Sequence, residues 1–107
     1  MSFPFGFGGY RIAEGDATHE AALRHALERG VQLVDTSANY GDGASERLVG
    51  HFDVPAVVTK AGYSRSGSFP ETSAIADGTW HCIHPDFLED QLARSLERLR
   101  RTSIDTL

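Results

Sequence analysis

Short apolar runs that alternate with helix-like segments constrain the fold of this chain most strongly. Residues 5–11 (FGFGGYR) resemble a short strand or hairpin edge that runs into a glycine turn. Residues 31–37 (VQLVDTS) and 54–60 (VPAVVTK) are mostly apolar strand-like runs, and a further one begins at Ile104 (IDTL). Helix-like segments lie between them. This alternation predicts a parallel sheet whose strands are joined by crossover helices. The 107 residues are enough for one domain.

The first two helices are predicted from their end signals and their apolar periodicity. In residues 13–30 (AEGDATHEAALRHALERG), Asp16 or Thr18 can cap the start of a helix, and Gly30 can end it. After the second strand, Ser45 can cap a brief helix. Each helix can cover the sheet between two neighbouring strands, as a crossover connection requires.

The last third of the chain contains one long helix and, before it, a segment without clear periodicity. Residues 62–80 are rich in Gly, Ser, Thr and Pro, which predicts a long loop. Residues 85–101 are predicted to form a helix, since Pro85 suits a first helical turn and an apolar stripe follows. The stripe consists of Leu88, Leu92, Leu96 and Leu99.

Charge and cysteine content narrow the class of protein. The formal net charge of −5 argues against a broad nucleic-acid-binding surface, and no apolar run is long enough to span a bilayer. Residues 1–11 lack the basic start and apolar stretch of a secretory signal. Cys82 is the single cysteine, so an intrachain disulfide is excluded. We therefore expect a cytoplasmic protein without nucleic-acid or membrane partners.

Three polar side chains of different chemistry follow the predicted second and third strands. Asp35 and Lys60 each stand where a strand ends, and Tyr40 lies in the segment that leaves the Asp35 strand. Ligands of α/β folds bind at the carboxyl edge of the parallel strands. Asp35, Tyr40 and Lys60 are therefore expected to meet at one site.

An acid, a phenol and an amine can together deliver a proton. A free tyrosine has a pKa of about 10, and a nearby ammonium favours the phenolate and lowers that pKa. An aspartate paired with the lysine keeps the lysine charged and fixes its position. Such a set could protonate a developing alkoxide. The alternative is that Asp35 forms a turn, Tyr40 packs and Lys60 is solvated.

Two other features near the predicted long helix are open to a functional or a structural interpretation. The segment His81-Cys82-Ile83-His84 has soft ligands, but its spacing matches no common zinc pattern, so we expect no metal site. The structural interpretation is that His84 caps the helix that begins at Pro85. Trp80 could line a substrate pocket or simply pack.

Several segments in order resemble the aldo-keto reductase superfamily. They are VDTSANYGDGASERLVG, then VVTK, then HPDFLEDQLARSLERLRRTSIDTL, and the resemblance runs from Gly6 to Leu107. The resemblance implies a (β/α)8 TIM barrel, of which this chain holds roughly the first three to four parallel strands with their helices. It also implies an NADPH-dependent, less often NADH-dependent, reductase of aldehydes and ketones that can run the reverse oxidation.

The resemblance further implies roles for matching residues. Tyr40 would be the general acid, Lys60 would lower its pKa, and Asp35 would pair with Lys60 and lie near the nicotinamide ribose. Gly8, Gly9 and Tyr10 match the turn after the first barrel strand, where the family's backbone approaches the cofactor. The substrate would be a small carbonyl compound or alcohol, and the cofactor NADP(H), with NAD(H) as the alternative.

The chain is shorter than the roughly 250 residues that a (β/α)8 barrel needs. Residues 1–107 are therefore expected to be a partial NADP-dependent oxidoreductase domain, truncated on its C-terminal side and inactive alone. The family's catalytic histidine follows the fourth strand, and none of the chain's histidines matches that place. These are His19, His25, His51, His81 and His84.

Two alternatives to a catalytic role remain open. The chain could be a truncated, non-catalytic relic that binds a partner or nothing. It could also be a small α/β domain that closes by self-association, since an incomplete barrel exposes strand edges that can pair with another chain.

Overall fold

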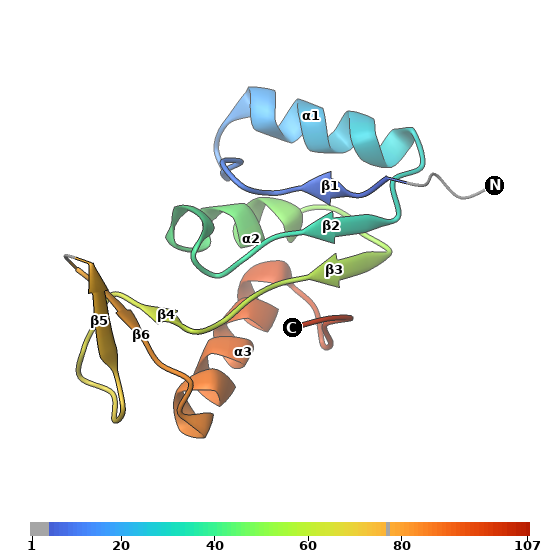
Figure 1. The fold of residues 1–107 in the computed structure, drawn as a ribbon. Helices are drawn as coiled ribbons and strands as arrows, with labels where there is room; N and C mark the ends of the chain where they lie inside the picture. The colour runs from blue at the N-terminus through green and yellow to red at the C-terminus, as the bar shows by residue number, and fades with distance from the viewer. Residues whose placement is uncertain (1–4, 77) are drawn as a thin grey trace.

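A parallel three-stranded sheet forms the centre of the molecule in the computed structural model, which describes residues 5–76 and 78–107 (Figure 1). The strands are β1 (Phe7–Gly8), β2 (Leu33–Asp35) and β3 (Ala56–Val58), and they lie in the order β1-β2-β3. The predicted parallel sheet is thereby confirmed. Beyond β3, Thr106 makes an isolated parallel bridge to Val58, where a fourth strand was expected to begin.

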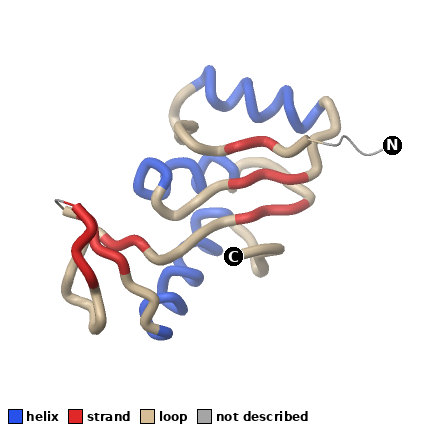
Figure 2. Tube along the Cα trace, viewed as in Figure 1, coloured by secondary structure: helices blue, strands red, loops and turns tan. Residues whose placement is uncertain are grey.

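Three α-helices follow the strands, as the alternating pattern predicted (Figure 2). They are α1 (Ala17–Glu28), α2 (Ala44–Val49) and α3 (Pro85–Leu99), and a short 3-10 helix, η1 (Tyr40–Gly43), precedes α2.

The ends of the two longer helices agree with their predicted capping signals. The Asp16 carboxylate accepts hydrogen bonds from the backbone N–H groups of Thr18 and His19, which the first turn of α1 leaves unpaired. Gly30 follows α1 with a φ of +98°, a left-handed conformation that favours glycine. At α3, the His84 ring accepts from the N–H of Asp86, which supports its interpretation as a cap.

The prediction that Ser45 caps the second helix is wrong. Gly43 occupies the position before α2, with a φ of +96°, and Ser45 lies inside the helix. The Ser45 hydroxyl instead donates to the carbonyl of Gly9, 36 residues earlier in the chain. The capping signal was misinterpreted because a serine beside a helix start also suits a buried contact with another element.

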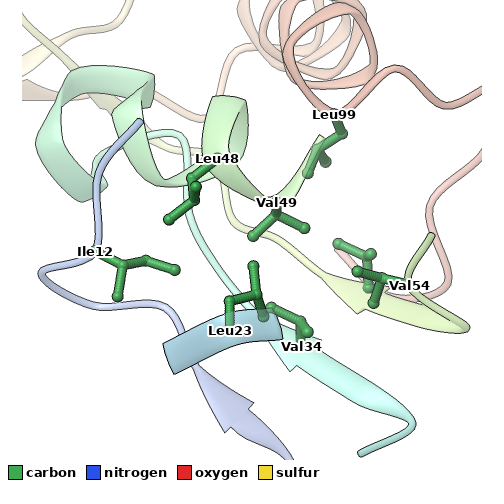
Figure 3. Close-up of a cluster of buried hydrophobic side chains, with 8 residues drawn as sticks. Ile12, Leu23, Val34, Leu48, Val49, Val54 and Leu99 are labelled. Carbon is green, nitrogen blue, oxygen red and sulfur yellow. The ribbon is translucent and has the colours of Figure 1, made fainter. Parts of the chain in front are cut away.

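The hydrophobic core lies between the sheet and the helices (Figure 3). Strand register places Phe7, Val34 and Val57 side by side, and these residues face the helices. Leu33 has the opposite orientation, as expected for its neighbour along a strand, and is 40% exposed. The buried members of the core cluster are Ile12, Leu23, Val34, Leu48, Val49, Val54, Val57 and Leu99.

The prediction of a long loop over residues 62–80 is wrong in part, since the longest stretch without a strand in this segment is only residues 65–72. This segment forms a second, antiparallel sheet of β4 (Tyr63–Ser64), β5 (Ser73–Ala76) and β6 (Thr79–His81), in the order β4-β6-β5. Its strands are two to four residues long, and all four residues of β5 are exposed. Because the segment contributes nothing to the core cluster, its sequence needs no apolar periodicity.

The antiparallel sheet projects beyond the carboxyl ends of the parallel strands (Figure 1). Within the described residues, no strand pairs with the outer edge of β1, and the predicted self-association through such an edge stays a prediction. Within the same residues, no helix has the length and apolar character needed to cross a bilayer.

Candidate active site

Strand register brings the predicted acid and amine onto the face of the sheet that points away from the helices. Gly8, Asp35 and Val58 lie side by side across β1, β2 and β3. Lys60 stands two residues beyond Val58 and therefore points to the same face. The carboxyl edge of the sheet thus collects Asp35 and Lys60, as the sequence predicted.

Lys60 is held by two hydrogen bonds from its ammonium. One goes to Oδ1 of Asp35, and the other goes to the backbone carbonyl of Thr36 at 2.8 Å. The Asp35 and Lys60 side chains are 49% and 46% exposed. The pair is therefore fixed in position but open on one side to an incoming molecule.

Tyr40 is brought to the same place by η1. The backbone turns sharply there, with φ values of +60° at Gly41 and +51° at Asp42. The centroid of the Tyr40 ring lies 4.9 Å from the Lys60 ammonium. The ring also makes an edge contact with Tyr10, with 5.2 Å between centroids.

The pKa of Lys60 reflects these neighbours. Partial burial by itself lowers the pKa of this ammonium. The bonded Asp35 carboxylate and the nearby Tyr40 side chain together outweigh burial and raise the pKa above its ordinary value. Lys60 is therefore a permanent cation beside the phenol at neutral pH.

Ser45 of α2 connects the ends of β1 and β2 on the helix-facing side. Its hydroxyl lies 2.8 Å from the carbonyl oxygen of Gly9 and 2.7 Å from the hydroxyl of Thr36. All three residues are buried. A Cβ at position 9 would lie 2.8 Å from the carbonyl oxygen of Asp35, so glycine is required for this close approach.

Glu46, the next residue, connects β3 with the long helix. Its fully buried carboxylate accepts from the Thr59 hydroxyl at 2.7 Å and from Nε of Arg98 at 2.7 Å. Thr59 directly precedes Lys60. Sequence reasoning missed the roles of Ser45 and Glu46, and the presence of two polar side chains shortly before Leu48 and Val49 gave no signal that they are buried.

Gly8, Gly9 and Tyr10 lie at the end of β1, where Gly8 is level with Asp35 and Tyr10 contacts Tyr40. Gly8 is exposed, and a Cβ built on it would meet no atom within 4 Å, so the space above it is open. Tyr10 is 63% exposed. Gly9 is buried, and its N–H donates to the Asp35 carbonyl at 2.6 Å. The backbone therefore comes close to its surroundings at Gly9, whereas Gly8 and Tyr10 face open space.

A pocket of about 340 Å³ is lined by Tyr40 and Lys60, and Asp35 is not part of its lining. Tyr63 and His81 of the antiparallel sheet also contribute to the lining. Gln91 of α3 contributes as well. The antiparallel sheet thus builds part of the pocket, which the prediction of a long loop did not anticipate.

The three side chains singled out from the sequence therefore lie together, and the His81-Cys82-Ile83-His84 segment does not form a cluster. Within the described residues, no group of three His, Cys, Asp or Glu side chains is arranged to hold a metal ion. Cys82 is buried, and its thiol lies 3.4 Å from the carbonyl of Pro70. Trp80 is half-buried in β6 and is not part of the pocket lining.

Comparison with known proteins gives the family. The family model of the aldo/keto reductase family matches residues 4–107. A curated relative, the aldo-keto reductase yakc [NADP(+)] of Schizosaccharomyces pombe, is 32% identical over 111 residues. That match covers 94% of this chain and 31% of the relative, so the chain spans about a third of the relative's length.

Solved structures show the same fold. The aldo-keto reductase AKR11C1 from Bacillus halodurans superposes with a TM-score of 0.76 at 23% identity. The glycerol dehydrogenase AKR11B4 from Gluconobacter oxydans gives 0.70 at 24% identity. Each match covers 94% of this chain and 33% of the neighbour. The three parallel strands and their helices thus correspond to the N-terminal part of a (β/α)8 barrel, and the chain belongs to the aldo/keto reductase family.

Proposed function

We propose that the protein is an NAD(P)H-dependent oxidoreductase that reduces aldehyde or ketone carbonyls to alcohols, or runs the reverse reaction. The observation that carries the proposal is the arrangement of Asp35, Tyr40 and Lys60. The Lys60 ammonium is bonded to Asp35 and lies 4.9 Å from the Tyr40 ring centroid, beside a pocket of about 340 Å³. Family membership adds support for an oxidoreductase.

In the proposed reaction, Tyr40 acts as the general acid. Its hydroxyl donates a proton to the carbonyl oxygen of the substrate as negative charge develops there. The proton leaves a phenolate, which the Lys60 ammonium stabilises by opposite charge. Asp35 and the Thr36 carbonyl keep that ammonium in place through the two hydrogen bonds described above.

NADPH, when bound, supplies the hydride for this chemistry. The residues at the end of β1 fit such a cofactor, since Gly8 leaves open space and Tyr10 presents an exposed ring. The half-exposed Asp35 carboxylate can accept hydrogen bonds from ribose hydroxyls. The curated relative carries NADP(+) in its name, and a Klebsiella pneumoniae aldo-keto reductase with the same fold was solved with NADPH. NAD(H) is the alternative cofactor.

Replacing the proposed acid tests this function. Tyr40→Phe is expected to lower kcat for NADPH-dependent aldehyde reduction by roughly 10²- to 10⁴-fold. The affinity for NADPH, measured by fluorescence quenching, is expected to change little. Thr102→Val is the control, because it also removes a hydroxyl, from an exposed residue away from the pocket. Equal kcat for Tyr40→Phe and wild type would refute the assignment.

The same assay separates catalysis from a non-catalytic binding role. It should be run on the 107-residue chain and on the protein at its natural length. NADPH binding without turnover at natural length would favour the binding alternative. A cytoplasmic location is also part of the proposal, and it rests on the lone Cys82, which is buried with its thiol free. Cell fractionation tests that location.

A further inference from the structure

The antiparallel sheet supplies pocket residues that the proposed proton transfer does not use. Tyr63 belongs to β4 and His81 to β6, and these two residues are paired across the sheet. Their rings meet edge to face, with 6.2 Å between centroids. Both residues line the pocket that Tyr40 and Lys60 also line.

Gly62 lies beside His81 in the lining of the pocket. Its φ of +127° is a conformation that side chains rarely adopt. A Cβ built there would lie 3.7 Å from Nε2 of His81 and would occupy space beside the imidazole. The chain therefore places a residue without a side chain between Lys60 and the Tyr63–His81 pair.

The imidazole of His81 has unused hydrogen-bonding capacity. Among the residues that the structure describes, neither of its ring nitrogens has a hydrogen-bond partner, and the residue is exposed to the pocket. A neutral imidazole carries one donor and one acceptor. By contrast, the rings of His19, His51 and His84 each form a hydrogen bond with a protein atom.

We infer that His81 is a specificity-determining residue that binds a hydroxyl group of the substrate, at a distance from the carbonyl that Tyr40 protonates. The inference rests on the proposed function. The favoured substrates are then small hydroxylated aldehydes or ketones, together with the corresponding polyols in the reverse direction. A hydroxyl can both accept from and donate to the ring, whereas an unsubstituted alkyl chain leaves the polar groups of the pocket without a partner.

The test compares glyceraldehyde with propanal, which have the same carbon chain and differ in two hydroxyl groups. Wild-type protein at its natural length is expected to have the higher kcat/KM for glyceraldehyde. His81→Phe is expected to reduce that preference, measured as the ratio of the two kcat/KM values, about tenfold, because one hydrogen bond is lost. His81→Gln retains a donor and an acceptor and is expected to restore most of the preference. His25→Phe in α1 is the control, since His25 does not line the pocket.

The outcomes separate the inference from the proposed function. Reduction of neither aldehyde would contradict the proposed function and the inference with it. Reduction of both with an unchanged preference in His81→Phe would overturn the inference alone. A second measurement is independent of turnover: the NMR signals of the His81 ring should shift on titration with glycerol and not with propan-1-ol. Equal shifts with both alcohols, or no shift with either, would also overturn the inference.

Discussion

The parallel strands and the antiparallel sheet are both regular structure, but different interactions stabilise them. The parallel strands and their helices enclose all eight buried members of the core cluster. The antiparallel sheet encloses none of them, and Ile75 at its outer strand is 54% exposed. Burial of apolar surface therefore fixes the first region, whereas hydrogen bonds and ring contacts fix the second.

The two regions also contribute differently to the site. The parallel region contains the proposed proton donor and its charged partners. The strand ends beside them are bonded to α2, at Gly9 by Ser45 and at Thr59 by Glu46. The antiparallel region adds Tyr63 and His81 to the lining of the pocket. The proposed proton donor thus belongs to the buried region, and residues proposed to contact the substrate belong also to a less buried sheet. Substitutions in that sheet can therefore change substrate preference without disturbing the proton donor.

Truncating one apolar side chain in each region should give the largest contrast in stability. Leu48→Ala removes a side chain that is 2% exposed and is expected to lower the free energy of unfolding by about 3 kcal/mol. Ile75→Ala in β5 is expected to change it by less than about 0.5 kcal/mol, because that side chain is already hydrated. Urea denaturation followed by circular dichroism measures both. Similar losses would contradict the difference drawn between the regions.

Removing the buried charge of Glu46 should have a smaller effect that still reaches the site. Glu46→Gln leaves Arg98, whose side chain is 21% exposed, without its counter-charge. The expected loss in the free energy of unfolding is about 2 kcal/mol. Glu89→Gln on the exposed side of α3 is the matched control and should change little. An unchanged stability for Glu46→Gln would show that the carboxylate is not a connection between α2, β3 and α3.

The Lys60–Asp35 pair should contribute least to the free energy of unfolding, and its contribution should decrease at high pH. Since the folded state raises the pKa of Lys60, the contribution is complete below the unfolded-state pKa and is lost as pH rises through the folded-state value. The difference in unfolding free energy between wild type and Lys60→Met should therefore be constant up to about pH 10 and shrink as the pH rises above that value. Because both side chains are nearly half exposed, it should stay below about 1 kcal/mol.

Arg94→Met is the matched comparison for the pH experiment. Arg94 forms an exposed ion pair with Asp90 at 2.9 Å, and its guanidinium stays protonated throughout this range. Its difference from wild type should not vary with pH. A Lys60→Met difference that grows at high pH would contradict the stated direction.

The parts of the fold predicted from the sequence are those whose residues are buried with a regular period. Val34 and Val57 lie in apolar runs, and Leu23 and Leu99 lie on helix stripes, so burial left a visible pattern. The strands β4, β5 and β6 were missed because they are short and largely hydrated. Their Gly, Ser and Thr residues are common in loops and equally compatible with a small antiparallel sheet.

The site was predicted in part for a similar reason. Asp35 and Lys60 follow buried strands, so topology alone brings them to one edge. Tyr40 could be placed only near that edge, since its position depends on the left-handed turn at Gly41 and Asp42. The contacts of Ser45 and Glu46 join residues 9 to 52 positions apart in sequence, and His81 belongs to the sheet that was missed. No local pattern encodes these positions.

The kinetics of Lys60→Met, measured with NADPH and an aldehyde in the protein at its natural length, test whether Lys60 supports Tyr40 as the proton donor. Wild type is expected to turn over, and Lys60→Met is expected to lower kcat by roughly 10²-fold or more, because Tyr40 loses the cation that stabilises its phenolate. Arg94→Met, which removes a surface cation, should match wild type. Turnover by Lys60→Met at the wild-type rate, or no turnover by wild type, would contradict the proposed role of the Asp35, Tyr40 and Lys60 set.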